Sequence, residues 1–320
     1  MTAVVRDRYG APDVLERADV PVPALVDDGV LVRVRAVSVN PADWFAVTGT
    51  PYLGRALTGL RQPRSRLVGT DFAGTVEAVG KDVTQFRPGD EVLGGRSGAF
   101  AEQVCARTVA RKPANLTFEE AAAVPLAGLT ALQGLRDKGQ VRAGHRVLIN
   151  GASGGVGTFA VQIAKALGAE VTAVCSTGNV ELVRSLGADR VIDYAHEDFT
   201  RSGGRYDVLL DIAGSRPWSD CERALAPRAT VVLVGGPKTN RLLGPGSHSA
   251  AMLVRALGSR RKAAFFVARF NRPDLDALRE MLEAGTVRPV IDRSYPLTEI
   301  ADAFRYLSEG HARGKVVLTV

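Results

Sequence analysis

The N-terminal part of the chain alternates short apolar runs with glycine and proline. Apolar runs occur at 30–37, 74–79 and 91–93, and breaks occur at Pro41 and at Pro88-Gly89-Asp90. Short apolar runs bounded by such residues are typical of an irregular, largely antiparallel β domain. We therefore predict a β-rich N-terminal region.

From Thr117 onward the pattern changes to alternating helices and strands. Thr117 and Glu120 have the spacing of a capping box, so a helix is expected to begin there. Buried strands and helical stripes alternate beyond it, which indicates an α/β, doubly wound parallel sheet. The expected strands begin at Val147, Val171 and Val191 and cover 208–212, 230–234 and 315–320, and late helices are expected at 274–284 and 299–307.

A glycine-rich turn between 146 and 167 carries the strongest chemical signal. Val147-Leu148-Ile149 reads as a buried strand, and apolar residues at helical spacing follow the turn. Gly151, Gly154 and Gly157 stand where bare backbone N–H groups and a helix N-terminus can meet a phosphate. The GxxGxxG spacing is looser than the usual dinucleotide fingerprint, and a purely structural turn is the alternative. The position between strand and helix favours a dinucleotide site.

The next strand, at 170–175, ends where NAD enzymes place an acid that binds the ribose hydroxyls. Here Ser176, Thr177, Gly178 and Asn179 follow the strand, and none of them is acidic. Hydroxyl and amide donors could receive a 2′-phosphate, which favours NADPH over NADH. The segment itself holds no Lys or Arg, and the nearest cations are at 184 and 190.

Composition describes an ordinary globular protein with room for two domains. The chain has 320 residues, 46% of them hydrophobic and 23% charged, with no apolar stretch long enough to span a bilayer. Cys105, Cys175 and Cys221 have no CxxC spacing, which favours a reducing compartment, and we expect a cytoplasmic enzyme. The net charge of +7 includes basic clusters at 55–66 and 255–262, but no nucleic-acid-binding module is recognisable. Nucleic-acid binding is therefore a minor hypothesis.

Several further motifs are spread along the chain: Val39-Asn40-Pro41-Ala42-Asp43, Gly69-Thr70-Asp71-Phe72-Ala73-Gly74, Pro88-Gly89-Asp90-Glu91-Val92, Pro125 to Ala131 and Gly314-Lys315-Val316-Val317-Leu318. Together with the glycine turn, they resemble the medium-chain dehydrogenase/reductases, specifically their zinc-independent quinone oxidoreductase branch, to which zeta-crystallin belongs. The resemblance implies a GroES-like β-rich catalytic domain at 1–118 and 268–320 and a Rossmann domain at 119–267.

The residues that hold zinc in other members of this superfamily are missing. Zinc alcohol dehydrogenases have a Cys in the stretch matching 38–43 and a His-Glu pair where this chain has Thr70-Asp71. Threonine and asparagine are poor zinc ligands at neutral pH. The four histidines are scattered, and each is expected at the surface. We therefore expect no metal, with Asp71 as a structural acceptor.

Without a Lewis acid to polarise an alcohol or aldehyde oxygen, quinones and α,β-unsaturated carbonyls become the natural hydride acceptors. The resemblance implies that Asn40 lies in the substrate cleft, where we expect it to donate to the substrate oxygen, and Asp43 and Tyr52 could orient groups or relay a proton. Asn40-Pro41 could instead form an Asx-type turn, and Tyr52 could be a packed loop aromatic.

The expected cofactor contacts come partly from the glycine turn and partly from the resemblance. Relatives place a threonine beside the nicotinamide, a tyrosine near the adenosine phosphate and glycines near the nicotinamide ribose. The full expected set is Thr130, Gly151, Ser153, Gly154, Gly155, Val156, Gly157, Ser176, Thr177, Asn179, Tyr194, Gly235, Gly236, Phe265 and Lys315.

Residues 262–269 read as an edge strand, and in relatives such a strand pairs across a two-fold axis, so a homodimer is expected. Phe265 and Phe266 would then serve the interface or the substrate cleft. For the activity, a pathway-specific enoyl or carbonyl reductase and a non-catalytic NADPH- or RNA-binding protein are the alternatives.

Overall fold

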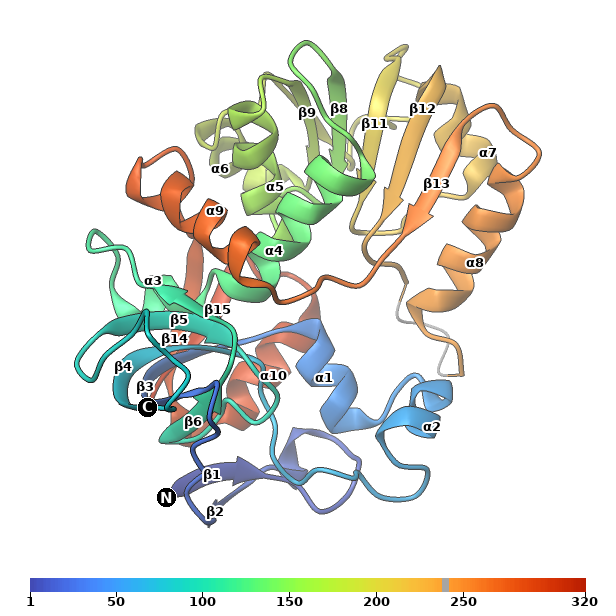
Figure 1. Ribbon diagram of the computed structural model, residues 1–320. Coiled ribbons are helices and arrows are strands. Elements are labelled where there is room, and N and C mark those ends of the chain that lie inside the picture. The colour runs from blue at the N-terminus through green and yellow to red at the C-terminus, as the bar shows by residue number, and fades with distance from the viewer. Residues whose placement is uncertain (238–241) are drawn as a thin grey trace. The chain divides into compact units, whose positions relative to one another are not determined.

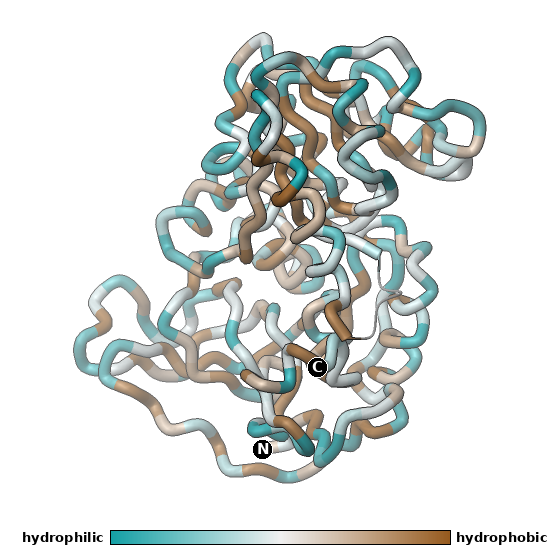
Figure 2. Tube along the Cα trace, turned by 90° about the vertical axis from the view of Figure 1, so that its right-hand side faces the viewer, coloured by the Kyte–Doolittle hydropathy of each residue, from teal (hydrophilic) through white to brown (hydrophobic). Residues whose placement is uncertain are grey.

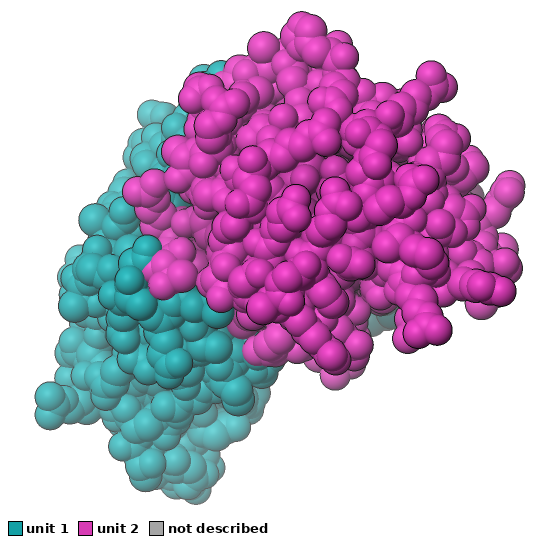
Figure 3. Space-filling view, turned by 90° about the horizontal axis from the view of Figure 1, so that it is seen from above, with its two compact units in different colours: residues 1–129, 270–285, 289–320 teal, residues 130–269, 286–288 magenta. Residues whose placement is uncertain are grey.

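The structure, a computed structural model, describes residues 1–237 and 242–320 and divides into two compact units, coloured separately in Figure 3. The first unit comprises residues 1–129, 270–285 and 289–320, and the second comprises residues 130–269 and 286–288. The sequence placed the first boundary at 118/119, whereas the units meet at 129/130, within helix α4 (Pro125–Leu132). No helix in the described ranges is both long and apolar enough to cross a bilayer.

The first unit is built on a seven-stranded, mostly antiparallel sheet with the order β14-β15-β3-β4-β5-β7, and β6 pairs with β3 (Figure 1). The antiparallel β domain expected from the sequence is confirmed. A separate pair, β1 and β2, forms a two-stranded sheet. The strands are β1 (Thr2–Val5), β2 (Glu16–Asp19), β3 (Val30–Val39), β4 (Asp71–Val79), β5 (Glu91–Gly95), β6 (Gln103–Ala106), β7 (Val109–Arg111), β14 (Ile291–Pro296) and β15 (Lys315–Thr319).

The C-terminal strand lies inside this sheet, between β14 and β3. β15 pairs antiparallel with β3, with Val317 opposite Ser38 and Val316 opposite Val39. This register puts Lys315, the first residue of β15, next to Asn40, which follows the end of β3.

Helix α10 closes the core of the first unit. Its Phe304 is fully buried and lies edge-on to Phe100, with ring centroids 6.2 Å apart, and 6.3 Å from the ring of Trp44. Aromatic pairs in this range contribute beyond the area that they bury. The helices of this unit are α1 (Pro41–Thr48), α2 (Arg55–Thr58), α3 (Phe118–Ala122), α9 (Arg272–Glu283) and α10 (Ile300–Glu309), and α4 begins in it.

The second unit is a six-stranded parallel sheet in the order β10-β9-β8-β11-β12-β13, the doubly wound arrangement predicted from the sequence. The strand order reverses between β8 and β11, so the carboxyl ends of these two strands form the topological switch point. In Figure 2 the apolar, brown stretches run along the strands of this parallel sheet. Its elements are β8 (Arg146–Asn150), α5 (Gly155–Ala166), β9 (Glu170–Cys175), α6 (Val180–Ser185), β10 (Arg190–Asp193), β11 (Tyr206–Asp211), α7 (Trp218–Cys221), β12 (Leu225–Leu233), α8 (Pro245–Ala256) and β13 (Lys262–Phe265).

Of two predictions made from short segments, one was confirmed in full and the other in part. Thr117 caps α3 as expected: its hydroxyl accepts from Glu120 N, and the Glu120 carboxylate accepts from Thr117 N. The edge strand expected over 262–269 ends at Phe265, so its second half is not a strand. Phe265 is 47% exposed on this edge.

Candidate functional site

The glycine turn of the second unit joins β8 to α5. Gly151 has φ +94°, a conformation that favours glycine. A Cβ at Gly157 would lie 2.6 Å from the Ala152 carbonyl carbon, so only hydrogen fits there. A Cβ at Gly154 would meet only the Gly151 oxygen, at 3.7 Å, so the space in front of Gly154 is open. Since the first N–H groups of α5 have no partner within the helix, this opening suits a phosphate.

Asn179 lies beside the glycine turn and contacts it through Ser153. It ends the short 3₁₀ turn Thr177–Asn179 that follows β9, and it is only 8% exposed. Its Nδ2 donates to Ser153 Oγ at 3.1 Å and to Ser176 Oγ at 3.0 Å. Its Oδ1 is buried without a hydrogen-bond partner. An orphaned buried acceptor is costly, and a ribose hydroxyl would satisfy it. The expected residues Ser153, Ser176 and Asn179 therefore lie together and fit a nucleotide.

An acidic residue does lie near residues 176–179, but it belongs to the neighbouring strand, β10. Asp193, at the end of β10, is in register with Cys175 at the end of β9. Its carboxylate accepts from Ala195 N at 3.0 Å and contacts His196 Nδ1 at 2.8 Å. Hydrogen bonding, from Thr177 above all, lowers the pKa of Asp193. Sequence reasoning considered only the end of β9 and missed this group.

The two cations named from the sequence as nearest to residues 176–179 are already paired. Arg184 forms an ion pair with Glu181, and Arg190 forms one with Glu197. Their charges are therefore partly compensated by neighbouring carboxylates.

The switch point carries a polar group that the sequence did not reveal. Asp211, at the end of β11, accepts through Oδ1 from Asn150 Nδ2 at 2.8 Å and from Gly214 N at 2.9 Å. Its Oδ2 is buried without a hydrogen bond and faces His248 Nε2 at 3.6 Å. His248 was expected at the surface, but its side chain on α8 is only 15% exposed. That expectation was wrong because the histidine faces a buried carboxylate.

Ligands of open α/β sheets bind outside the carboxyl ends of the strands at a switch point. The glycine turn, Asn179 and Asp211 all lie at such strand ends of one sheet. The second unit therefore has the residues that a dinucleotide needs.

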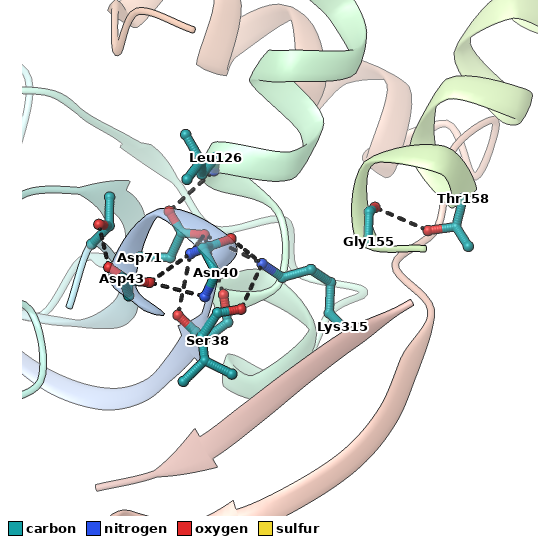
Figure 4. Close-up of polar contacts among 10 residues, drawn as sticks. Ser38, Asn40, Asp43, Asp71, Leu126, Gly155, Thr158 and Lys315 are labelled. Carbon is teal, nitrogen blue, oxygen red and sulfur yellow. Dashed lines mark hydrogen bonds and ion pairs between the residues drawn. The ribbon is translucent and has the colours of Figure 1, made fainter. Parts of the chain in front are cut away.

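The first unit holds a buried polar cluster, formed by Ser38, Asn40, Asp43, Asp71 and Lys315 (Figure 4). Four elements supply it: the end of β3, the start of α1, and the first residues of β4 and β15. All five residues are at most 3% exposed.

Asn40 lies at the centre of the cluster, and both ends of its amide are engaged. Nδ2 donates to Asp71 Oδ2 at 3.0 Å, to Asp43 Oδ2 at 3.2 Å and to the Ser38 carbonyl at 3.4 Å. Oδ1 accepts from Lys315 Nζ at 2.5 Å. An amide has only two N–H donors, so neither is left over for a substrate oxygen. Asn40 is also the N-cap of α1, which is the turn position considered as the alternative.

Asp43 accepts from Thr70 Oγ1 at 2.7 Å and from Asn40 N at 2.9 Å. Burial, reinforced by the charge of Asp71, raises the pKa of Asp43 to about 6. Lys315 Nζ lies 3.6 Å from Asp71 Oδ2, and burial lowers the pKa of this lysine. Burial also raises the pKa of Asp71, although Lys315 opposes the shift. The cluster thus holds two carboxylates and one ammonium, and Asp43 carries the excess negative charge.

Asp71 also accepts from Leu126 N at 3.1 Å and from Ser38 Oγ at 3.2 Å, in the acceptor role expected of it. Its side chain faces an ammonium, an amide and a hydroxyl. These partners do not fit a metal centre, because a zinc ion would have to displace Lys315 and find nitrogen or sulfur ligands. In the ranges 1–237 and 242–320, no three His, Cys, Asp or Glu side chains gather to hold a metal.

The remaining expected residues are dispersed. Lys315, expected near the cofactor, has its ammonium inside the buried polar cluster. Tyr52 is 43% exposed, and the guanidinium carbon of Arg55 lies 4.8 Å from its ring centroid. Tyr194 is 60% exposed, beside the end of β10. Thr130 lies on α4. Gly155 and Val156 open α5, whereas Gly235 and Gly236 follow β12.

Two family models match the chain. Residues 26–188 match the family described as alcohol dehydrogenase GroES-like domain, and residues 186–318 match the one described as zinc-binding dehydrogenase. The chain is 37% identical to mouse mitochondrial "NAD(P)H oxidoreductase RTN4IP1", over 100% of this chain and 89% of the mouse protein. It is 33% identical to the Arabidopsis thaliana "Chloroplast envelope quinone oxidoreductase homolog", over 99% of this chain and 98% of that protein.

Among solved structures, the quinone oxidoreductase from Coxiella burnetii superposes with a TM-score of 0.87 at 31% identity, covering 100% of this chain and 99% of that one. Several relatives are named as oxidoreductases that use NAD(P)H or NADPH, and the second unit has residues that could hold such a nicotinamide cofactor. The chain is an oxidoreductase that belongs to the medium-chain dehydrogenase/reductase superfamily, in its quinone oxidoreductase branch.

Proposed function

We propose that the chain is an NADPH-dependent reductase that transfers hydride to a quinone or an α,β-unsaturated carbonyl and works without zinc. The observation that carries the proposal is the buried polar cluster. Its cation is the Lys315 ammonium, held by Asn40 and Asp71. A fixed ammonium repels a divalent ion, and the enzyme then has no Lewis acid for an unactivated carbonyl. Acceptors that spread the incoming charge over a conjugated system suit such an enzyme.

The second unit supports the cofactor part of the proposal. The opening before Gly154 and the N-terminus of α5 would hold the pyrophosphate, and Asn179 Oδ1 would accept from a ribose hydroxyl. When bound, the nicotinamide supplies the hydride, and the protein's contribution is to orient it and exclude water.

The preference for NADPH rests on Ser176, whose hydroxyl accepts from Asn179 and offers its own O–H donor where NAD enzymes carry an acid. The Thr177 hydroxyl already hydrogen-bonds to Asp193. Asp193 opposes this preference, since a carboxylate beside this segment repels a 2′-phosphate. Contacts with Ala195 N and His196 partly compensate that charge. We therefore propose that both cofactors are accepted and that NADPH is preferred.

Within the first unit, Asn40 and Asp43 act as positioning residues in this proposal, because their polar atoms are engaged inside the cluster. Tyr52 is the proposed proton donor. Its ring is half-exposed, and its hydroxyl has no hydrogen bond among the described residues. Hydride adds to the acceptor carbon, and the proton passes to the acceptor from Tyr52 or from water.

Oxidation of NADPH followed at 340 nm tests the activity. The acceptors are 1,4-benzoquinone, 9,10-phenanthrenequinone and a simple enone, with NADH in parallel. We expect turnover with NADPH preferred, and loss of turnover in Gly154→Asp, whose carboxylate would occupy the phosphate opening. Stoichiometric zinc in the purified protein, or inhibition by a chelator, would contradict the zinc-independent mechanism.

A pathway-specific enoyl reductase is the second candidate. The enoyl reductase CurK superposes with a TM-score of 0.82 at 27% identity over 99% of this chain. Turnover of an enoyl thioester, with no turnover of the quinones, would favour it. Tight NADPH binding without turnover of any acceptor would favour a non-catalytic role, and salt-sensitive RNA binding would then be examined.

We also propose a homodimer that pairs through β13. This strand is the edge of the parallel sheet, with Phe265 47% and Val267 73% exposed beside it. Exposed edges of this kind invite pairing with a second copy. Sedimentation velocity of the wild type and of Val267→Asp tests it, and a monomeric wild type would exclude it.

The proposed compartment is the cytoplasm, because the three cysteines are free and buried, as a reducing environment allows. Fractionation of the source cells tests this, since some relatives are named as mitochondrial or chloroplastic.

A further inference from the structure

Arg6 is a buried arginine that has no acceptor for its charge. It follows β1 and is 5% exposed. Its Nε and Nη1 are buried without hydrogen-bond partners, and no ion pair within 1–237 and 242–320 includes it. Burial lowers the pKa of Arg6, and Tyr9 opposes the shift. Arginine nevertheless remains charged in proteins.

A second guanidinium lies against the same tyrosine. The guanidinium carbon of Arg6 is 5.8 Å from the centroid of the Tyr9 ring, and that of Arg55 is 4.5 Å from it. Arg55 donates through Nε to the Gly49 carbonyl at 2.8 Å. The Tyr9 hydroxyl lies 2.9 Å from the Gly59 carbonyl.

Neither guanidinium has a carboxylate partner among the described residues. The acid beside Arg6 in the sequence, Asp7, forms its ion pair with Arg66. Two cations therefore share one aromatic ring with no compensating negative charge.

The faces of aromatic rings attract a cation but do not accept its in-plane N–H groups. A buried charge with unsatisfied donors is expensive, so a site of this kind is stable only with a further acceptor. Nε and Nη1 are the buried, unpaired nitrogens of the Arg6 side chain, and Nη2 is its only other nitrogen. Because Nη2 shares one edge of the guanidinium with Nε and another with Nη1, an oxyanion that reaches Nη2 can bind in bidentate geometry.

We propose that Arg6 binds the oxyanion group of a small molecule, either a carboxylate or a phosphate, and that Arg55, against the same Tyr9 ring, adds positive charge to the site. The site belongs wholly to the first unit and does not depend on the proposed reductase activity. Tyr9 and Tyr52 supply aromatic surface for the organic part of the ligand.

Urea unfolding without nicotinamide cofactor tests the site, with succinate, inorganic phosphate or chloride at equal ionic strength. A ligand that binds only the folded protein lowers the unfolding equilibrium constant about tenfold at ten times its Kd. In the wild type, we expect succinate or phosphate to lower the unfolding equilibrium constant by more than chloride does. Arg6→Gln should lose this response, and Arg6→Lys, which keeps the charge but not the fork, should keep only part of it.

Arg8→Gln is the matched control, because Arg8 is exposed two residues away and its loss changes the net charge equally. It should respond as the wild type does. Gly154→Asp should also keep the response, which separates Arg6 from anion binding at the glycine turn. An equal response in Arg6→Gln and wild type would overturn the proposal.

A crystal structure of the wild type grown in phosphate or succinate gives a second readout that needs no variant. An oxyanion within hydrogen-bond distance of Arg6 Nη2 would support the site. Comparison of crystals grown in succinate with crystals grown in phosphate shows which of the two anions the site prefers. A guanidinium that contacts only water or protein atoms would overturn the proposal.

Discussion

Replacing Asp43 with Asn should remove a specific, pH-dependent part of the stability. The carboxyl of Asp43 is fully buried, and burial raises its pKa from 3.8 to about 6. Between these values the folded protein binds a proton that the unfolded chain does not. The free energy of unfolding must therefore fall as the pH rises through this window, and stay low above it.

The size of the effect follows from the pKa difference. One pKa unit corresponds to about 1.4 kcal/mol, so the whole window is worth about 3 kcal/mol. About 2 kcal/mol of this falls between roughly pH 4.5 and 7.5. Asn imitates the protonated, neutral acid and does not titrate. The stability of Asp43→Asn relative to wild type should therefore increase by about 2 kcal/mol over that range.

Urea unfolding at several pH values measures this difference, with fluorescence as the signal. The chain has two tryptophans, and a Trp218→Phe background leaves Trp44, next to Asp43 in α1, as the reporter for the first unit. Titration of groups that do not interact with Asp43 cancels between the two proteins, whereas Asp71 and Lys315 interact with it. Hydrogen bonds lost on replacing the carboxylate shift the whole curve but not its slope.

Asp28→Asn is a control, because the pH dependence that Asp28 gives to the free energy of unfolding has the opposite sign. The hydrogen bond of Asp28 with Arg107 lowers the pKa of this exposed carboxyl. Its small contribution is therefore present above the unfolded pKa and lost as the pH falls. A difference between Asp43→Asn and wild type that does not change with pH, or that decreases as pH rises, would refute the reasoning about Asp43.

Other predictions follow from single contacts. Gly157→Ala should lower the thermal unfolding midpoint, because its Cβ would meet turn backbone at a cost of about 1–3 kcal/mol, whereas Gly154→Ala should unfold like wild type. Lys315→Met should cost about 3–5 kcal/mol in urea unfolding, and adding Asp71→Asn should recover most of it. Burial raises the pKa of Cys175 to about 11, so mass spectrometry should find it unlabelled by iodoacetamide at neutral pH until the protein unfolds.

The parts of the structure that follow local rules could be predicted from the sequence. The Thr117 cap, the parallel strands and the glycine turn each depend on residues close together in the chain. The clustering of Ser153, Ser176 and Asn179 followed from the same rule, because consecutive parallel strands end at one edge of a sheet. Asp193 was missed because its proximity depends on the register between β9 and β10.

The role of Asn40 could not be decided in this way. In the sequence, Asn-Pro can be a turn or a donor in a cleft, and both fit the residues around it. The choice depends on Lys315, 275 residues away, whose ammonium takes the amide oxygen and turns both N–H groups toward carboxylates. The pairing of β15 with β3 creates that contact, and no local pattern encodes it.

The same pairing supplies the buried polar cluster with its cation. Two buried carboxylates without a cation would be costly, and one lysine from β15 compensates one of the two negative charges. One negative charge remains in excess, and burial together with the charge of Asp71 raises the pKa of Asp43. If that reasoning holds, Lys315→Met should raise the pKa of Asp43 further, and the pH window of Asp43→Asn relative to its parent should move upward in the Lys315→Met background.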